Sequence, residues 1–211
     1  KKGTRLAVPE IAALQTAGIG EVIVARLEEG DIAEDNAAAR LAATALHPSV
    51  RIASPSTGRV NIHAEADGLF VVDRHAIEAI NRVDPSITIA TLAEFAPVAC
   101  GQMVATVKII PFAVPVEKLD AAIAAAKSAS PLLKVAPWFS KPVGLVATEL
   151  PSLKPEVMDK TARILQARLA RSGSILMKEV RVPHDEDAVG NAIKDLAKDG
   201  ARLIVVFGAS A

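Results

Sequence analysis

The chain has 211 residues, of which 51% are hydrophobic and 3% aromatic, and it contains no tyrosine. Its 24 basic and 24 acidic residues balance, and no apolar run approaches the roughly 20 residues that a spanning helix needs, so we expect neither nucleic acid nor a membrane as a partner. A single cysteine, Cys100, excludes an intrachain disulfide and, with no visible secretory leader, favours a cytoplasmic protein in which Cys100 is a small buried apolar residue.

Residues 1–137 predict a smaller α+β module with β-hairpin or barrel character. The module begins with a short helix at residues 8–17, which has Pro9 in its first turn and Gly18 at its C-terminal end. A strand is expected at residues 21–27. Asp31 is then suited to cap a second helix, which continues through an alanine-rich stretch to about His47.

The centre of this module has a different texture. Between residues 50 and 72, short alternating runs are interrupted by Pro55, Gly58 and Gly68, which is typical of hairpins or of a small barrel. The remaining expected elements are helices at 74–83 and 116–128 and strands at 87–92 and 102–110. Residues 130–137 contain two prolines and predict a linker, so the domain boundary is expected after residue 137.

Residues 138–211 predict a β-α-β-α-β unit, with strands at 143–148, 175–182 and 202–207 and helices at 156–171 and 185–198. Each crossover is long enough for parallel strand pairing, which makes right-handed winding the default. The apolar spacing predicts which helical residues face the sheet. These are Val157, Thr161, Ile164, Leu165 and Leu169 in the first helix and Val189, Ile193, Leu196 and Ala197 in the second.

The end of the chain carries the clearest functional pattern. Leu203–Phe207 is a run of five large apolar residues, which predicts a strand covered on both faces in a parallel sheet. Gly208, Ala209, Ser210 and Ala211 follow, and such small residues let backbone N–H groups approach a phosphate. Neither a Gly-x-Gly-x-x-Gly nor a Gly-Lys-Ser/Thr motif is present, so a dinucleotide site or P-loop is not indicated. An ordinary strand-to-helix turn is the alternative interpretation.

Three stretches of the second half resemble the molybdopterin-binding domain shared by molybdopterin adenylyltransferases and molybdopterin molybdotransferases. They are residues 142–150 (Pro-Val-Gly-Leu-Val-Ala-Thr-Glu-Leu), 182–189 (Val-Pro-His-Asp-Glu-Asp-Ala-Val) and 203–211 (Leu-Ile-Val-Val-Phe-Gly-Ala-Ser-Ala). Residues 2–19 are similar to the segment that molybdotransferases place before this domain. The chain departs from the family at Ala209, which stands where the family has a second glycine.

This resemblance implies a three-layer α/β/α fold with a parallel sheet, incomplete at Ala211, where the family continues with an acidic segment. It implies a pterin ligand held by Thr148, Glu149, Asp159, Lys160, Gly208, Ala209 and Ser210, with Asp185 as a Mg²⁺ ligand. The implied function is molybdenum cofactor biosynthesis, either adenylylation of molybdopterin, for which ATP is the co-substrate, or insertion of molybdate. The family also implies a homo-oligomer.

Each of these residues also has an ordinary structural interpretation. Thr148 can simply end a strand, Asp159 and Lys160 can be a solvated surface pair, and Asp185 can cap a helix. His184 is expected to be a half-exposed loop residue. At the level of function, two rivals stay open: a non-catalytic molybdopterin carrier that acts with a fused or partner nucleotidyltransferase, and a doubly wound domain for another phosphorylated ligand.

Overall fold

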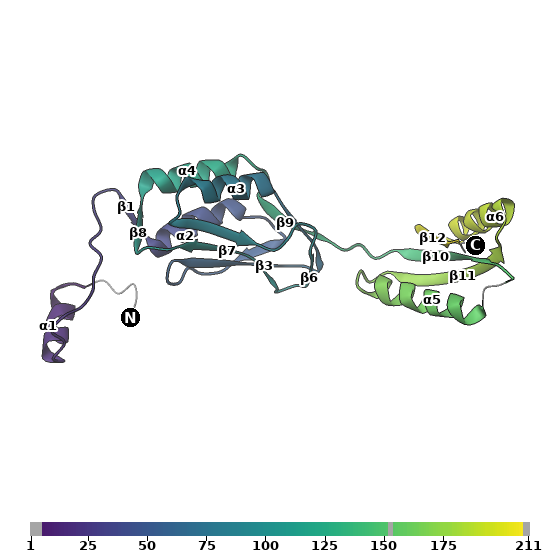
Figure 1. Ribbon diagram of the computed structural model, residues 1–211, viewed down its shortest axis with the longest axis horizontal. Helices are drawn as coiled ribbons and strands as arrows, with labels where there is room; N and C mark the ends of the chain where they lie inside the picture. The colour runs from purple at the N-terminus through teal and green to yellow at the C-terminus, as the bar shows by residue number, and fades with distance from the viewer. Residues whose placement is uncertain (1–5, 152–153, 209–211) are drawn as a thin grey trace. The chain divides into compact units, whose positions relative to one another are not determined.

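The computed structural model describes residues 6–151 and 154–208, and the chain divides into two compact units, Lys1–Pro137 and Trp138–Ala211. Both units mix helices and strands, so the expected α/β class is confirmed (Figure 1). Within the described ranges, no helix combines the length and the apolar character that crossing a membrane requires. Each unit is described below by itself.

Unit 1, residues 1–137, is built from short helices and antiparallel strands. Its helices are α1 (Val8–Thr16), α2 (Glu34–Ala42), the 3₁₀ turn η1 (Ala43–Ala45), α3 (Arg74–Val83) and α4 (Val116–Lys127). Its strands are β1 (Asp31–Ala33), β2 (Val50–Ile52), β3 (Arg59–Ala64), β4 (Gly68–Val72), β5 (Ile87–Thr91), β6 (Pro97–Val98), β7 (Met103–Ile109), β8 (Ala113–Pro115) and β9 (Leu133–Pro137).

The strands of unit 1 form three antiparallel sheets around one apolar core. Their orders are β2-β3-β7-β5, β6-β4-β9 and β1-β8. Strand β3 alternates between exposed or half-exposed residues and buried Val60, Ile62 and Ala64, as a sheet with one face on the core requires. Helices α2 and α3 pack on this sheet, and α4 packs on both of these helices (Figure 1).

Two expectations near the start of unit 1 are wrong. Residues 21–27 form no strand, because no neighbouring strand pairs with them, and Ile23 is 97% exposed. Asp31 does not cap a helix: it begins strand β1, and its carboxylate accepts a hydrogen bond from the N–H of Glu28 at 3.0 Å. Helix α2 starts three residues later, after Ala33, once the chain has paired with β8.

The predicted linker at residues 130–137 is also wrong over most of its length. Leu133–Pro137 is strand β9, which pairs antiparallel with β4 and buries Leu133 and Val135 in the core of unit 1. Gly68 of β4 makes this pairing possible, because a Cβ there would overlap the carbonyl oxygen of Ala136. The prolines resemble linker composition, but the strand partner lies some sixty residues earlier in the chain.

Cys100 is exposed, in contrast to the buried position expected from its apolar character. It lies in the turn between β6 and β7, where its backbone N–H donates to Asp67 at 2.7 Å. The residue is therefore placed by its backbone rather than by packing of its thiol.

Unit 2, residues 138–211, contains three parallel strands and two helices in its described part. In chain order they are β10 (Pro142–Glu149), α5 (Pro155–Ala170), β11 (Ile175–Pro183), α6 (Glu186–Lys198) and β12 (Leu203–Phe207). The sheet order is β11-β10-β12, with both pairings parallel. The predicted β-α-β-α-β order and the parallel pairing are thus confirmed.

The two helices of unit 2 cover opposite faces of β10. Leu145 packs with Ala162 and Leu165 of α5, whereas the next residue, Val146, packs with Ala192 and Leu196 of α6. Successive residues of a strand point to opposite faces, so α5 and α6 sandwich the central strand. Gly144 allows the close approach of α6, because a Cβ there would lie 2.9 Å from Leu196 Cδ1.

The inward faces of the helices differ in part from the prediction. In α5 the buried residues are Met158, Ala162 and Leu165, whereas Val157 and Ile164 are 49% and 43% exposed. In α6 the buried residues are Ala192 and Leu196, whereas Ala197 is exposed. The prediction therefore holds for Val189, Ile193 and Leu196 of α6 and for Leu165 and Leu169 of α5, which pack on the strands.

Strand β12 is an edge strand within the described residues. It pairs with β10 on one side only, and Leu203, Val206 and Phe207 are each more than one third exposed. The expectation that this strand is covered on both faces is therefore confirmed only at its centre in the described structure. The neighbouring helices protect only its central residues, Ile204 and Val205.

Candidate functional site

The order of the strands in unit 2 creates a switch point between β10 and β12. The connection through α5 leads from β10 to one neighbour, and the connection through α6 returns to the opposite side of β10. At such a point the two loops leave the sheet in opposite directions, and the crevice at the carboxyl ends of the strands is where doubly wound sheets bind ligands. Thr148 and Glu149 end β10 here, and Gly208 follows β12.

Thr148 is the centre of a small hydrogen-bonded group at this edge. Its side chain is almost fully buried, with 3% of the residue exposed. Its hydroxyl donates to the carbonyl oxygen of Phe207 at 3.3 Å and lies 3.0 Å from Nδ1 of His184. This group connects the ends of all three described strands of unit 2.

Gly208 and Asp185 lie next to this group. A Cβ built on Gly208 would come within 4.0 Å of Cε1 of His184, so a side chain at this position would contact the imidazole. Asp185 follows His184 and caps α6, where its Oδ1 accepts the N–H of Ala188 at 2.9 Å. The structure therefore brings together Thr148, His184, Asp185 and Gly208 on the side of the sheet that α6 covers.

Asp159 lies elsewhere, on the face that α5 covers. Its carboxylate pairs with the guanidinium of Arg181 at 2.5 Å, and Arg181 also binds Glu179 at 2.7 Å. Glu179 and Arg181 alternate along β11 with Val180 and Val182, which pack against α6, so the ion pairs belong to the opposite face. The hydrogen bonds to Glu179 and then to Asp159 raise the pKa of Arg181 above its usual range.

The other predicted site residues are less engaged. Glu149 and Lys160 are exposed, as is Asp159. Ala209 and Ser210 lie outside the described residues. Among the described residues, no three His, Cys, Asp or Glu side chains are arranged to hold a metal ion. Asp185 as a Mg²⁺ ligand therefore stays a prediction, and it requires that a bound ligand supply phosphate oxygens to the same ion.

Two residues of this region make more contacts than the sequence alone predicts. The sequence predicts His184 only as a half-exposed loop residue, although its position directly before the capping Asp185 places it at the carboxyl edge of the sheet. Arg181 gives no signal of its own in the sequence, because its partners lie on β11 and α5.

No protein-family model, no curated protein and no solved structure matches this chain.

Proposed function

We propose that unit 2 binds molybdopterin, a phosphorylated pterin, at the switch point between β10 and β12. The observation that carries the proposal is the meeting of Thr148, His184 and Gly208 at the carboxyl ends of parallel strands. The resemblance of three stretches to molybdopterin-binding domains supplies the identity of the ligand. In this proposal, the domain is the three-layer molybdopterin-binding fold.

The chemistry of the site suits a phosphate. Backbone N–H groups after a strand are directional donors for phosphate oxygens, and the small residues of the sequence from Gly208 onward suit such a role. His184 adds a ring nitrogen, since the hydrogen bond between Nδ1 and the Thr148 hydroxyl fixes the ring and leaves Nε2 for a ligand. A Cβ at Gly208 would reach ordinary van der Waals contact with that ring, so glycine leaves this side of the imidazole uncovered.

Mg²⁺ fits this site only together with its ligand. The cation prefers one or two carboxylates completed by phosphate oxygens and water, and Asp185 offers one carboxylate whose Oδ1 already accepts a backbone hydrogen bond. Asp185 would hold the ion, and the ion would neutralise phosphate charge. Glu149, at the end of β10, is the other acidic residue among those named for this edge.

The protein is either an enzyme of molybdenum cofactor biosynthesis or a carrier that presents molybdopterin to a nucleotidyltransferase. One observation favours the carrier: Asp159, which the family resemblance assigns to ligand binding, is held in an ion pair with Arg181 on the other face of the sheet. Ala209, in the place of a family glycine, favours the same option. An enzyme would need a further acidic residue near the phosphate.

Anaerobic isothermal titration calorimetry with molybdopterin, with and without Mg²⁺ and ATP, tests the proposal. We expect saturable binding that Mg²⁺ strengthens. Formation of adenylylated molybdopterin in the presence of ATP identifies the enzyme, whereas binding without turnover identifies the carrier. A Thr148→Val variant, which keeps the shape of the side chain and removes its hydroxyl, should bind more weakly.

A competition series separates molybdopterin from other phosphorylated ligands. The same titration is repeated in the presence of AMP, GMP, CMP or pyrophosphate, each at equal concentration. Preference for molybdopterin over all four supports the pterin site. Tighter binding of any of them at unit 2 would replace the proposal by a site for that ligand, and no binding of molybdopterin would reject it.

A further inference from the structure

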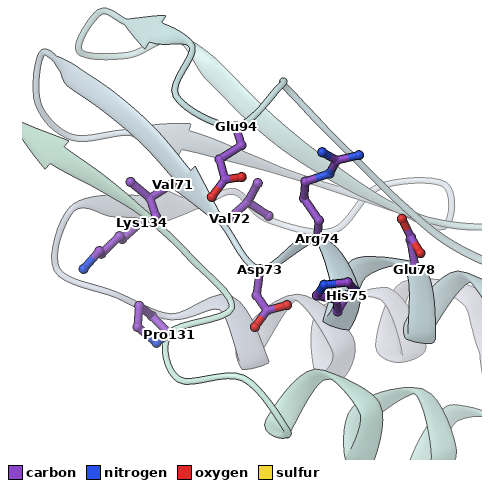
Figure 2. Close-up of a pocket in the computed structure, with 9 residues that line it drawn as sticks. All are labelled: Val71, Val72, Asp73, Arg74, His75, Glu78, Glu94, Pro131 and Lys134. Atoms are coloured by element: carbon purple, nitrogen blue, oxygen red, sulfur yellow. The ribbon is translucent and has the colours of Figure 1, made fainter.

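A groove in unit 1 has no role in the function proposed above. It consists of two hollows of about 670 and 540 Å³, which share the residues Val72, Arg74, Glu78 and Glu94. Volumes of this size are typical of small-molecule sites, which span about 300–1,000 Å³. The groove lies where β4 runs into α3, between the start of β9 and the loop that precedes β6 (Figure 2).

Phe95, which lines the smaller hollow, has a backbone conformation that its residue type disfavours. Its φ angle is +61°, at the third position of a turn closed by the hydrogen bond from Ala96 N–H to the Ala93 carbonyl at 3.1 Å. Turns of this kind normally have glycine or asparagine there. The residue is 61% exposed, so burial does not offset the strain.

The other non-glycine residue with a positive φ in the described chain shows that the strain at Phe95 is unusual. Thr57 has a φ of +53° and is followed by Gly58 at +73°, in the tight turn of a hairpin closed by reciprocal bonds between Ser56 and Arg59. Two successive positive φ angles are what such a two-residue hairpin turn requires. No comparable requirement explains phenylalanine rather than glycine at position 95.

Charged side chains without partners surround the rest of the groove. Within the described chain, Arg74, His75 and Lys134 form no side-chain hydrogen bond or ion pair with another described residue, and the same is true of Glu94. The remaining two acids are engaged: Asp73 caps α3 by accepting the Ala76 N–H, and Glu78 pairs with Arg82. Figure 2 shows the Glu94 carboxylate in the middle of this group, with the Arg74 guanidinium on one side of it and the Lys134 ammonium on the other.

We propose that this groove binds a small aromatic anion of the nucleoside monophosphate class. The base stacks on Phe95 in the smaller hollow, and the phosphate binds to Arg74, which lines both hollows, while Lys134 in the larger hollow adds a second positive charge. Glu94 lies between the two ends, where it accepts a hydrogen bond from a ribose hydroxyl or an exocyclic amine. The strained turn is retained because it presents the ring.

NMR titration of the whole chain with AMP tests this proposal. We expect amide shifts at residues 71–78 and 92–96, with at least tenfold weaker binding of adenosine, which lacks the phosphate, and of ribose 5-phosphate, which lacks the base. Shifts confined to unit 2, or equal binding of inorganic phosphate and AMP, would overturn the proposal. The proposed pterin site does not enter this test, because the expected shifts lie in unit 1 alone.

Matched variants separate the two ends of the ligand. Arg74→Gln with Lys134→Gln should weaken AMP binding at least tenfold. The control pair Arg59→Gln and Lys108→Gln removes the same charges from exposed positions that face each other on β3 and β7, outside the residues that line the groove, and should bind AMP as the unaltered chain does. If both pairs of substitutions weaken AMP binding equally, the effect comes from net charge alone, and the proposed site is wrong.

Two substitutions at Phe95 separate binding from stability. Phe95→Asn removes the ring and suits a positive φ, so we expect a melting temperature about 2–5 °C higher together with at least fivefold weaker AMP binding. Phe95→Leu also removes the ring but keeps the strain, so it should weaken binding without raising the melting temperature. Unchanged AMP binding in both variants would contradict the stacking role.

Discussion

Gly144→Ala tests the close packing of α6 on the central strand of unit 2. The added Cβ would lie 2.9 Å from Cδ1, 3.1 Å from Cδ2 and 3.2 Å from Cγ of Leu196. Leu196 is fully buried, so its side chain has no free space to move into and the helix must shift by several tenths of an ångström. Overpacking of this kind costs about 1–3 kcal/mol.

This loss is large for a unit of this size. A domain as short as unit 2 has a total stability of only about 4–10 kcal/mol, and each kcal/mol changes the melting temperature of such a domain by roughly 4–8 °C. Thermal unfolding of the whole chain, followed by circular dichroism, should therefore show an earlier transition for unit 2. The transition of unit 1, which contains neither residue, should stay in place.

A double-mutant cycle with Leu196→Ala supplies the control. Leu196→Ala alone leaves a cavity and should cost about 2–5 kcal/mol. In the double variant the methyl group added at position 144 occupies part of that space, so the combined loss should be smaller than the sum of the two single losses by about 1 kcal/mol or more. Additive losses, or an unchanged melting temperature for Gly144→Ala, would refute the packing described for α6.

Three further predictions concern single residues. Gly68→Ala should unfold unit 1 or lower its free energy of unfolding, measured in urea, by about 3 kcal/mol or more, because the added Cβ would overlap the backbone of β9. A loss well below this value would mean that β9 does not pair with β4. Asp185→Asn keeps a side chain that caps helices but removes the negative charge. Calorimetry should therefore show that Mg²⁺ strengthens molybdopterin binding less in this variant, while the melting temperature stays unchanged. If Mg²⁺ strengthens binding as much as in the unaltered chain, Asp185 acts only as a helix cap. The hydrogen bonds from Ser86 lower the pKa of Asp84 below its usual value of 3.8, so the carboxylate stabilises the fold above that pH and loses this effect as the pH falls below it. The difference in unfolding free energy between the unaltered chain and Asp84→Ala, measured in urea, should therefore be smaller at about pH 3 than at about pH 7. An equal difference at both pH values would contradict the role assigned to Ser86.

Local sequence patterns were sufficient for much of the secondary structure. Helices α3 and α4 and the alternation of strands and helices in unit 2 follow from apolar periodicity and from Pro and Gly at the ends of elements. The strand expected at residues 21–27 fails because an apolar run becomes a strand only beside a partner, and none of the described strands lies there. The prediction of a linker at residues 130–137 fails for the opposite reason: this segment pairs with β4, which is distant in the chain, and local composition gives no sign of that partner.

The candidate site was predictable to a similar extent. Thr148 and Gly208 follow from their positions at the ends of predicted parallel strands, because the topology brings carboxyl ends to one edge. The pairing of Asp159 with Arg181 was not predictable, since it depends on which face of β11 meets α5. The involvement of His184 depends on a hydrogen bond to Thr148, thirty-six positions earlier in the chain.

Amide hydrogen exchange, measured by mass spectrometry with and without molybdopterin under anaerobic conditions, tests the central claim most directly. The account predicts slower exchange in the peptides that contain the end of β10, residues 183–188 and the residues from Phe207 onward, with no change in peptides of β11 near Ile175 at the opposite edge of the sheet. Protection absent from these three segments, or found only at the amino ends of the strands, would contradict it.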